Sequence, residues 1–101
     1  YTWGRGAHGI LGHGDDQPQL VPKLVVDLQG LRIIQICCGY NHCVALSATG
    51  VVYTWGWGDN GRLGHGTDED QLTPKPVDAL ANVKITRVAC GVSHTMAASG
   101  K

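Results

Sequence analysis

The chain has 101 residues and a formal net charge of +0, from 8 basic and 8 acidic residues. This balance argues against direct binding to nucleic acid, because phosphate contacts normally require a basic excess. No apolar run approaches the roughly 18 residues that a membrane-spanning helix needs, so we expect no membrane partner.

The first strand signals lie on either side of residue 30. We expect residues 21–28 to form an outer, edge strand, because Pro22 cannot donate to a central ladder. Residues 33–38 are mostly β-branched or small and apolar, and Gly39 closes them, which predicts a second strand.

A hairpin follows. Residues 42–46 and 51–55 read as strands, and residues 47–50 (Ser-Ala-Thr-Gly) read as the tight turn between them. Gly50 would take a positive φ in that turn. We therefore expect an all-β fold, with short strands and no convincing helix.

The sequence repeats itself without a gap. Residues 1–4 (Tyr-Thr-Trp-Gly) return at 53–56, an offset of 52 residues, and residues 11–14 (Leu-Gly-His-Gly) return at 63–66. Further matches at this offset are Pro22-Lys23 with Pro74-Lys75, Cys38-Gly39 with Cys90-Gly91, and His42 with His94. Units of about four antiparallel strands at this length are typical of β-propeller blades. We therefore expect residues 1–52 to be one repeat and residues 53–101 a second, incomplete one.

The repeat resembles the regulator of chromosome condensation repeat. The residues that carry the likeness are Val52-Tyr53-Thr54-Trp55-Gly56-Trp57-Gly58, Gly61, Leu63-Gly64-His65-Gly66, Pro74, Val88-Ala89-Cys90-Gly91 and His94. The likeness covers essentially the whole chain. It implies a seven-bladed β-propeller, of which residues 1–101 would form about two blades of one domain. The chain then reads as a fragment that needs further blades, from a parent chain or by self-association.

Two glycine motifs invite a cofactor interpretation. Residues 4–9 and 56–61 both fit G-x-G-x-x-G and both follow a predicted strand. A dinucleotide loop needs a helix directly after the glycines, and Leu-Gly-His-Gly and a proline follow here instead. We therefore expect no cofactor and interpret the glycines as sharp turns that pass close to the next blade.

The histidines and cysteines are assigned to the scaffold. His13, His65, His42 and His94 recur once per unit, so we expect buried imidazoles that tie backbone groups of neighbouring strands. The four cysteines are Cys37, Cys38, Cys43 and Cys90, and none forms a C-x-x-C zinc pair. We expect no metal site and buried free thiols, which fits a reducing compartment, cytoplasmic or nuclear.

No pattern in the sequence predicts catalysis. Ser47 and Ser93 lack a nucleophile elbow, and His42 and Cys43 point to opposite strand faces. The carboxylates at 15–16 and 68–70 occupy the same polar loop of each unit, which favours a solvated loop over a weak Ca²⁺ site. We therefore expect no enzyme, with Trp3 and Trp55 in the core.

Candidate function lies where the two units differ. Trp57 replaces Arg5, and an exposed tryptophan in a glycine-rich loop is a good anchor for a protein partner. The family resemblance implies that such loops emerge on one face of the disc. Carried onto this chain, that face comprises Arg5, Tyr40, Asn41, Trp57, Asp59, Val92 and Ser93.

The leading hypothesis is a non-catalytic module that binds a protein partner through this face. The resemblance also implies alternatives: nucleotide exchange on a small GTPase, substrate recruitment for a HECT-type ubiquitin ligase, or contact with a chromatin protein. Ultraviolet sensing in this family uses Gly-Trp-Arg-His-Thr, and residues 39–43 and 91–95 lack its tryptophan and arginine.

Overall fold

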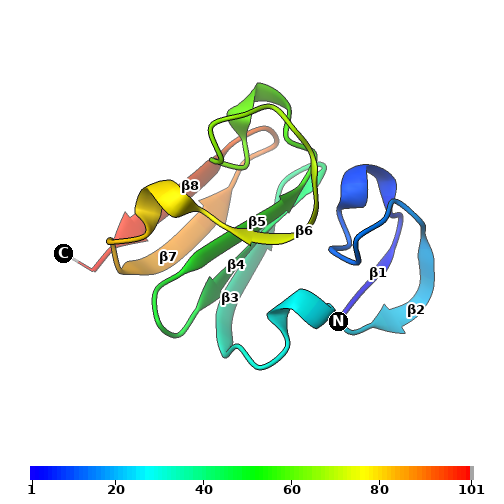
Figure 1. Ribbon diagram of the computed structural model, residues 1–101, viewed down its shortest axis with the longest axis horizontal. Coiled ribbons are helices and arrows are strands. Elements are labelled where there is room, and N and C mark those ends of the chain that lie inside the picture. Colours follow the sequence, from blue (N-terminus) through cyan, green and yellow to red (C-terminus); the bar gives the residue numbers. More distant parts are fainter. Residues whose placement is uncertain (101) are drawn as a thin grey trace.

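The computed structural model describes residues 1–100, which form three antiparallel sheets side by side (Figure 1). The strands are β1 (Thr2–Gly4), β2 (Gln19–Lys23), β3 (Ile33–Cys38), β4 (His42–Ser47), β5 (Val52–Gly56), β6 (Gln71–Pro76), β7 (Ile85–Cys90) and β8 (Thr95–Ser99). Single 3-10 turns join them: η1 (Ala7–Gly9), η2 (Val26–Leu28), η3 (Asp59–Gly61) and η4 (Asp78–Leu80). The fold is all-β, as predicted.

The central sheet is one complete four-stranded unit. Its order is β3-β4-β5-β6, and the flanking sheets contain two strands each, β1-β2 and β7-β8. By the 52-residue offset, β1-β2 correspond to the outer strands β5-β6, and β7-β8 correspond to the inner strands β3-β4. The complete sheet thus crosses the boundary between the two sequence units, and each flanking sheet is half a blade.

Three predicted strands and the hairpin turn are confirmed. The strands predicted at 33–38, 42–46 and 51–55 are β3, β4 and β5, with bounds shifted by at most one residue. Gly50 has φ 90°, and its amide donates to the Ser47 carbonyl at 3.0 Å. A residue with a Cβ would be strained at this φ, so the turn depends on glycine.

The strand predicted at 21–28 is wrong in its second half. The strand β2 ends at Lys23, and the chain then forms η2, in which the Leu28 amide donates to the Val25 carbonyl at 3.1 Å. Val25 is buried, and Leu28 packs against Cys43, Ala45 and Trp55. The turn directs Val25 and Leu28 inward and leaves Val26 exposed, so the segment is a strand followed by a turn.

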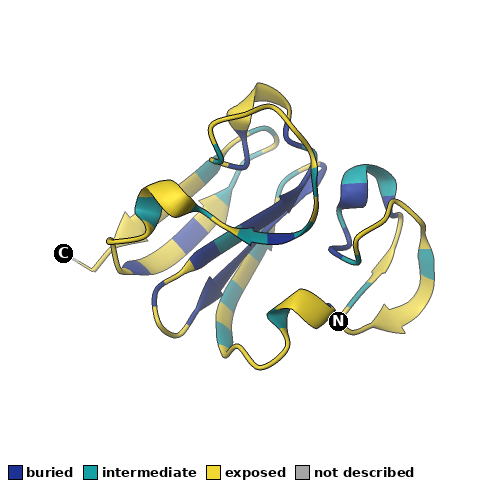
Figure 2. Cartoon of the chain, in the orientation of Figure 1, coloured by how far each residue is buried: buried dark blue, intermediate teal, exposed yellow. Residues whose placement is uncertain are grey.

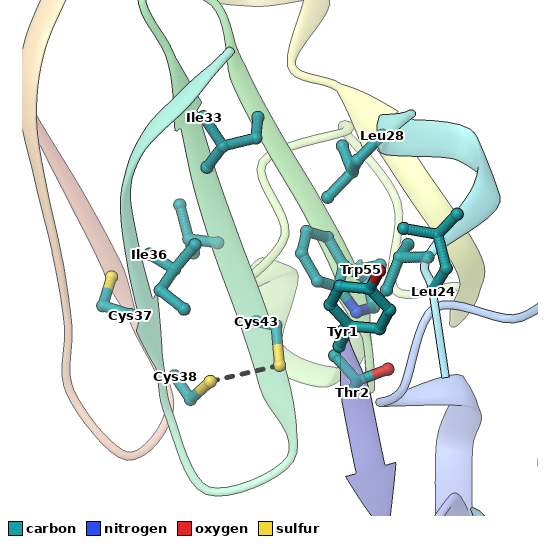
Figure 3. Close-up of a pocket in the computed structure, with 12 residues that line it drawn as sticks. Tyr1, Thr2, Leu24, Leu28, Ile33, Ile36, Cys37, Cys38, Cys43 and Trp55 are labelled. Carbon is teal, nitrogen blue, oxygen red and sulfur yellow. Dashed lines mark hydrogen bonds between the residues drawn. The ribbon is translucent and has the colours of Figure 1, made fainter. Parts of the chain in front are cut away.

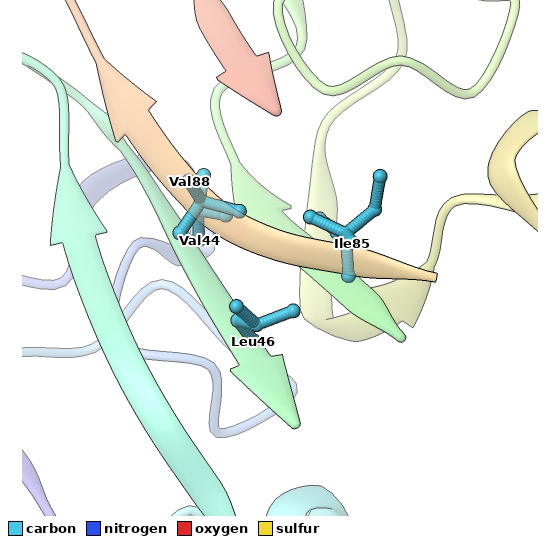
Figure 4. Packing of buried hydrophobic residues seen from close by; sticks show 5 residues of the cluster. Val44, Leu46, Ile85 and Val88 are labelled. Atoms are coloured by element: carbon cyan, nitrogen blue, oxygen red, sulfur yellow. The ribbon is translucent and has the colours of Figure 1, made fainter. Parts of the chain in front are cut away.

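Two apolar clusters cover opposite faces of the central sheet, and β4 is buried along its whole length (Figure 2). One cluster lies between this sheet and β7 and contains Val44, Leu46, Val52, Ile85 and Val88 (Figure 4). The other faces the β1-β2 sheet and contains Cys43, Ala45 and Trp55. Alternate residues of β4 therefore pack against different neighbours, and each sheet is stabilised by the sheets beside it.

The two equivalent tryptophans differ in burial. Trp55 lies in the core, as predicted, and is only 3% exposed. Its indole Nε1 donates to the Ile10 carbonyl at 2.9 Å. Trp3 is 59% exposed, against prediction. Trp55 is buried by the preceding sheet, whereas no described residues form a sheet before β1 to cover Trp3.

Candidate protein-interaction face

The glycine motifs form sharp turns that lie against neighbouring backbone. Gly4 and Gly56, at equivalent positions, have φ 105° and 107°. A Cβ on Gly58 would collide with the Glu69 carbonyl, and one on Gly9 would lie 2.7 Å from the Leu72 Cα in the next sheet. The expected close passage between blades is confirmed at Gly9, and each motif ends in a three-residue 3-10 turn, after which the chain leads to the next strand.

One pair of histidines binds threonine hydroxyls within a unit. His65 Nε2 lies 2.8 Å from Thr54 Oγ1, and this hydroxyl donates to the Leu63 carbonyl at 2.7 Å. The same arrangement occurs in the first unit with His13, Thr2 and Leu11. These imidazoles tie the loop to the strand, as predicted. The contact runs through a threonine hydroxyl, whereas the prediction was a direct contact with backbone groups.

His42 makes the corresponding contact between sheets. Its Nε2 lies 3.0 Å from Thr95 Oγ1, and that hydroxyl donates to the Arg62 carbonyl at 2.8 Å. Since the hydroxyl hydrogen is used, His42 donates from Nε2, and its buried Nδ1 has no partner among the described residues. Burial lowers the pKa of His42, and the nearby Arg62 charge lowers it further, so the imidazole is neutral.

The cysteines form two close pairs. Cys38 Sγ lies 3.2 Å from Cys43 Sγ, and Cys37 Sγ lies 3.0 Å from Cys90 Sγ. All are free thiols. Cys43 is buried as predicted, Cys37 and Cys90 are half-buried, and Cys38 is exposed, which corrects the expectation for that residue. Among residues 1–100, no group of three acidic, histidine or cysteine side chains is placed to hold a metal ion.

The acidic residues of the second unit close its glycine loop. Asp70 Oδ1 accepts from the Gly58 amide at 2.9 Å, and Asp68 Oδ1 accepts from the Gly61 amide at 3.0 Å. These carboxylates are exposed, but they are engaged with the loop backbone. They therefore hold the shape of the turn that carries Trp57 and Asp59.

Two large apolar side chains stand out from adjoining hairpin loops. Tyr40 and Val92 occupy equivalent positions between β3 and β4 and between β7 and β8, and each is 67% exposed. The Tyr40 amide donates to the Val92 carbonyl at 3.3 Å, so the two loops are joined. Ser93 beside them is half-buried.

Asn41 lies beneath this surface. It is 5% exposed, although the sequence placed it on the face. Arg5 Nη2 donates to Asn41 Oδ1 at 3.1 Å, and the Trp57 amide donates to the Asn41 carbonyl at 2.8 Å. Asn41 therefore connects the hairpin loop to both glycine loops.

Trp57 is half-buried, less exposed than the sequence predicts. The His8 ring stacks on it at a centroid distance of 4.9 Å, and Arg62 Cζ lies 4.5 Å from its centroid. Asp70 Oδ2 in turn lies 3.2 Å from His8 Nδ1. The sequence analysis did not single out His8 or Arg62, although both differ from their repeat equivalents, Asn60 and Ile10, and this difference is the signal that could have found them.

The two repeats of this chain match a known repeat family. The regulator of chromosome condensation (RCC1) repeat matches residues 1–46 and 49–98, and a second description of the same repeat matches residues 33–62. The chain belongs to the RCC1 repeat family. The RCC1 repeats of this chain carry the glycine loops and the histidine–threonine contacts described above.

Curated relatives of these RCC1 repeats are much longer proteins. The ultraviolet-B receptor UVR8 of Arabidopsis thaliana is 48% identical over 97 residues, which cover 95% of this chain and 22% of the receptor. The human E3 ubiquitin-protein ligase HERC2 is 48% identical over 97 residues, which cover 96% of this chain and 2% of the ligase. The chain thus spans less than a quarter of either relative.

Solved structures share the RCC1 fold. Human WBSCR16 matches with a TM-score of 0.77 and 32% identity, covering 96% of this chain and 25% of that one. Prp20p of Saccharomyces cerevisiae, which is described as binding Gsp1p and histones, matches with a TM-score of 0.75 and 24% identity, covering 94% of this chain and 25% of that one. Prp20p supports the fold alone. Within residues 1–100, no helix is long and apolar enough to cross a membrane.

Proposed function

We propose that this chain is part of a non-catalytic propeller module that binds a protein partner in the cytoplasm or nucleus. The partner contacts the interaction face, which we define as Arg5, Tyr40, Trp57, Asp59, Val92 and Ser93, with Asn41 buried beneath it. The observation that carries the proposal is that Tyr40 and Val92 are both exposed on loops that a backbone hydrogen bond joins. Exposed aromatic residues of this kind supply much of the binding energy at protein interfaces.

The surface beneath the pair is already ordered. Asn41 is buried and accepts from the Arg5 guanidinium and, through its carbonyl, from the Trp57 amide. A partner therefore meets loops whose backbone is tied together before binding. Preorganisation of this sort reduces the entropy lost on association, which favours affinity.

The rim of the face is polar and carries both signs of charge. Arg5 and Asp59 are exposed, and Ser93 is half-buried beside Val92. An apolar centre with a mixed polar rim matches the anatomy of protein–protein interfaces. A phosphate-binding surface would instead need clustered positive charge.

The relatives suggest classes of partner. The sequence resemblance implies a small GTPase or a chromatin protein as the partner class, and Prp20p, which shares the fold, is described as binding Gsp1p and histones. HERC2 is a ubiquitin ligase, so recruitment of a substrate to a ligase is an alternative role for the same contact. Each of these roles uses the face for binding and leaves chemistry to another protein or domain.

The proposal is tested by crosslinking followed by titration. A photoreactive amino acid in place of Tyr40 captures the partner, which is then identified, purified and titrated against the unmodified chain. We expect the double variant Tyr40→Ser/Val92→Ser to bind this partner about tenfold more weakly or worse, as for loss of interface anchors.

The matched control is Leu20→Ser, which removes an apolar side chain that is 94% exposed on β2. This variant should bind like the unmodified chain. Equal affinity of the double variant and the unmodified chain would overturn the assignment of the face. Accelerated release of labelled GDP from purified Gsp1p would instead favour the nucleotide-exchange role.

A further inference from the structure

The four cysteines form two pairs on opposite faces of the β3-β4 hairpin. Cys38 and Cys43 are cross-strand partners in the register of β3 and β4. Cys37 packs on the other face, where it meets Cys90 of the neighbouring sheet. The proposed binding role uses neither pair, and the repeat does not require them, because the equivalents of Cys37 and Cys43 are Ala89 and Thr95.

The Cys38–Cys43 pair combines an accessible sulfur with a buried one. Cys38 is exposed, and both residues line a cavity of about 260 Å³ between the β1-β2 sheet and the central sheet (Figure 3). Tyr1, Leu24 and Trp55 also line this cavity, which is largely apolar. A small reagent can therefore reach the exposed Cys38, and Cys43 Sγ lies 3.2 Å from Cys38 Sγ.

The two thiols of this pair differ in acidity. A hydrogen bond from Cys43 lowers the pKa of Cys38 to about 7. The same interaction, with burial, raises the pKa of Cys43, so Cys43 keeps its proton. At neutral pH, Cys38 is partly thiolate, the form that reacts with oxidants, and Cys43 is the thiol beside it.

We propose that Cys38 and Cys43 form an oxidation site that a hydroperoxide converts into a disulfide. The Cys38 thiolate attacks the terminal oxygen of the hydroperoxide, the O–O bond breaks, and the leaving oxygen takes a proton as water or an alcohol. Cys43 sulfur then attacks the resulting sulfenic acid, the S–O bond breaks, and the hydroxide leaves as water with the Cys43 proton. The two thiols lose two electrons, and the hydroperoxide gains them.

A disulfide between Cys37 and Cys90 is the competing product. Cys37 and Cys90 lie 3.0 Å apart, and a disulfide between them would join neighbouring sheets. However, both are half-buried, and burial, with the contact to Cys37, raises the pKa of Cys90 to about 12. This pair lacks the exposed thiol that begins the reaction.

The fold can accommodate the reaction at Cys43. The Cys43 thiol also lies 3.4 Å from the Ile10 carbonyl, a contact that the disulfide would end. The Trp55 indole donates to that carbonyl at 2.9 Å, so the carbonyl keeps a partner. We therefore expect oxidation without loss of the packing between sheets.

Peptide mapping distinguishes the two disulfides. Hydrogen peroxide is added to the reduced chain, remaining thiols are alkylated, and the protein is cut with trypsin after Arg32, Arg62 and Arg87. The expected product is an internal disulfide in peptide 33–62, which leaves Cys37 and Cys90 alkylated. A crosslink between this peptide and the one that begins at Val88 would assign the reaction to Cys37 and Cys90 and overturn the proposal.

The second unit supplies the control variants. Cys37→Ala introduces the residue found at Ala89 and should form the disulfide normally. Cys43→Thr introduces the residue found at Thr95, whose hydroxyl makes the equivalent bond to the Arg62 carbonyl. This variant should lose the disulfide and accumulate Cys38 sulfenic acid, which dimedone traps.

A further variant keeps the test independent of substitution in the core. Cys38→Ser changes the exposed position and should leave Cys43 reduced under the same treatment. Persistence of an internal disulfide in peptide 33–62 of Cys38→Ser, or full alkylation of all four thiols in the unmodified chain, would overturn the proposal.

Discussion

The guanidinium carbon of Arg62 lies 4.5 Å from the centroid of the Trp57 ring, and Arg62 is only 5% exposed. The other ring contact comes from His8, in the preceding unit. Arg62 Nη1 also donates to the Val92 carbonyl at 3.4 Å, on the following sheet. A stack that was not evident in the sequence therefore links all three sheets beneath the interaction face.

The first prediction concerns this stack. Arg62→Ile introduces the residue that the first unit carries at Ile10, so apolar volume is kept while the charge and the donors are lost. We expect the free energy of unfolding to fall by about 2 kcal/mol, the value of a desolvated cation–π contact. Urea denaturation followed by tryptophan fluorescence measures this change. An unchanged midpoint would mean that the stack adds nothing to stability.

The second prediction compares two equivalent glycines. Gly9 and Gly61 both have positive φ, 73° and 67°. Gly61→Ala meets open space, so it should cost only the backbone strain of roughly 1–2 kcal/mol. Gly9→Ala should cost clearly more, because its Cβ would lie 2.7 Å from the Leu72 Cα of the next sheet. Equal losses in thermal unfolding would contradict the close packing of these sheets.

The third prediction concerns pH. Burial and Arg62 lower the pKa of His42, and burial and Lys75 lower that of His65. The folded chain therefore binds fewer protons than the unfolded chain just below the ordinary histidine pKa of 6.5. Stability should be full above that value and should fall as the pH drops through it toward the folded pKa values.

Thermal unfolding across this pH range measures the effect. His42→Gln retains a donor toward Thr95 and does not titrate, so it should flatten part of the decline. A variant whose pH dependence matches that of the unmodified chain would show that His42 is not one of the responsible groups.

The fourth prediction concerns the two half-sheets. β8 matches β4, and β1 matches β5, so β8 of one copy can pair with β1 of another. The β4–β5 register joins Cys43 with Trp55 and Val44 with Thr54, which by the repeat offset places Thr95 beside Trp3 and Met96 beside Thr2. Unpaired edges favour such association.

We therefore expect the 101-residue chain to have a mass in solution above the 10.7 kDa of one copy. Closed rings would contain an even number of blades, six or eight. The variant pair Thr2→Cys and Met96→Cys, mixed as separate chains, should crosslink between copies. A stable monomer, with no crosslink, would contradict this pairing.

Much of the fold follows from the sequence. The offset of 52 residues, the turn glycines and the β-branched runs predict the strands β3, β4 and β5 and the propeller class. The candidate site was predicted less well. Tyr40 and Val92 are exposed on the expected face, but Asn41 is buried below it and Trp57 is half-buried. Their burial depends on Arg5 and His8 in the first glycine loop and on Arg62 at the end of the second.

The repeat in the sequence does not predict which cysteines lie together. The repeat offset relates Cys38 to Cys90, yet Cys90 lies against Cys37. Successive residues of a strand point to opposite faces, so Cys37 faces the following sheet, while Cys90, like its equivalent Cys38, faces the preceding one.

The sequence alone determined the repeating unit, because each unit must carry its own turns and its own apolar faces. Only the tertiary structure decided which side chains meet between units. Contacts between sheets join opposite faces of successive units: the pairs Cys37–Cys90 and His42–Thr95 are both 53 residues apart, one more than the repeat, so the repeat offset alone does not predict them.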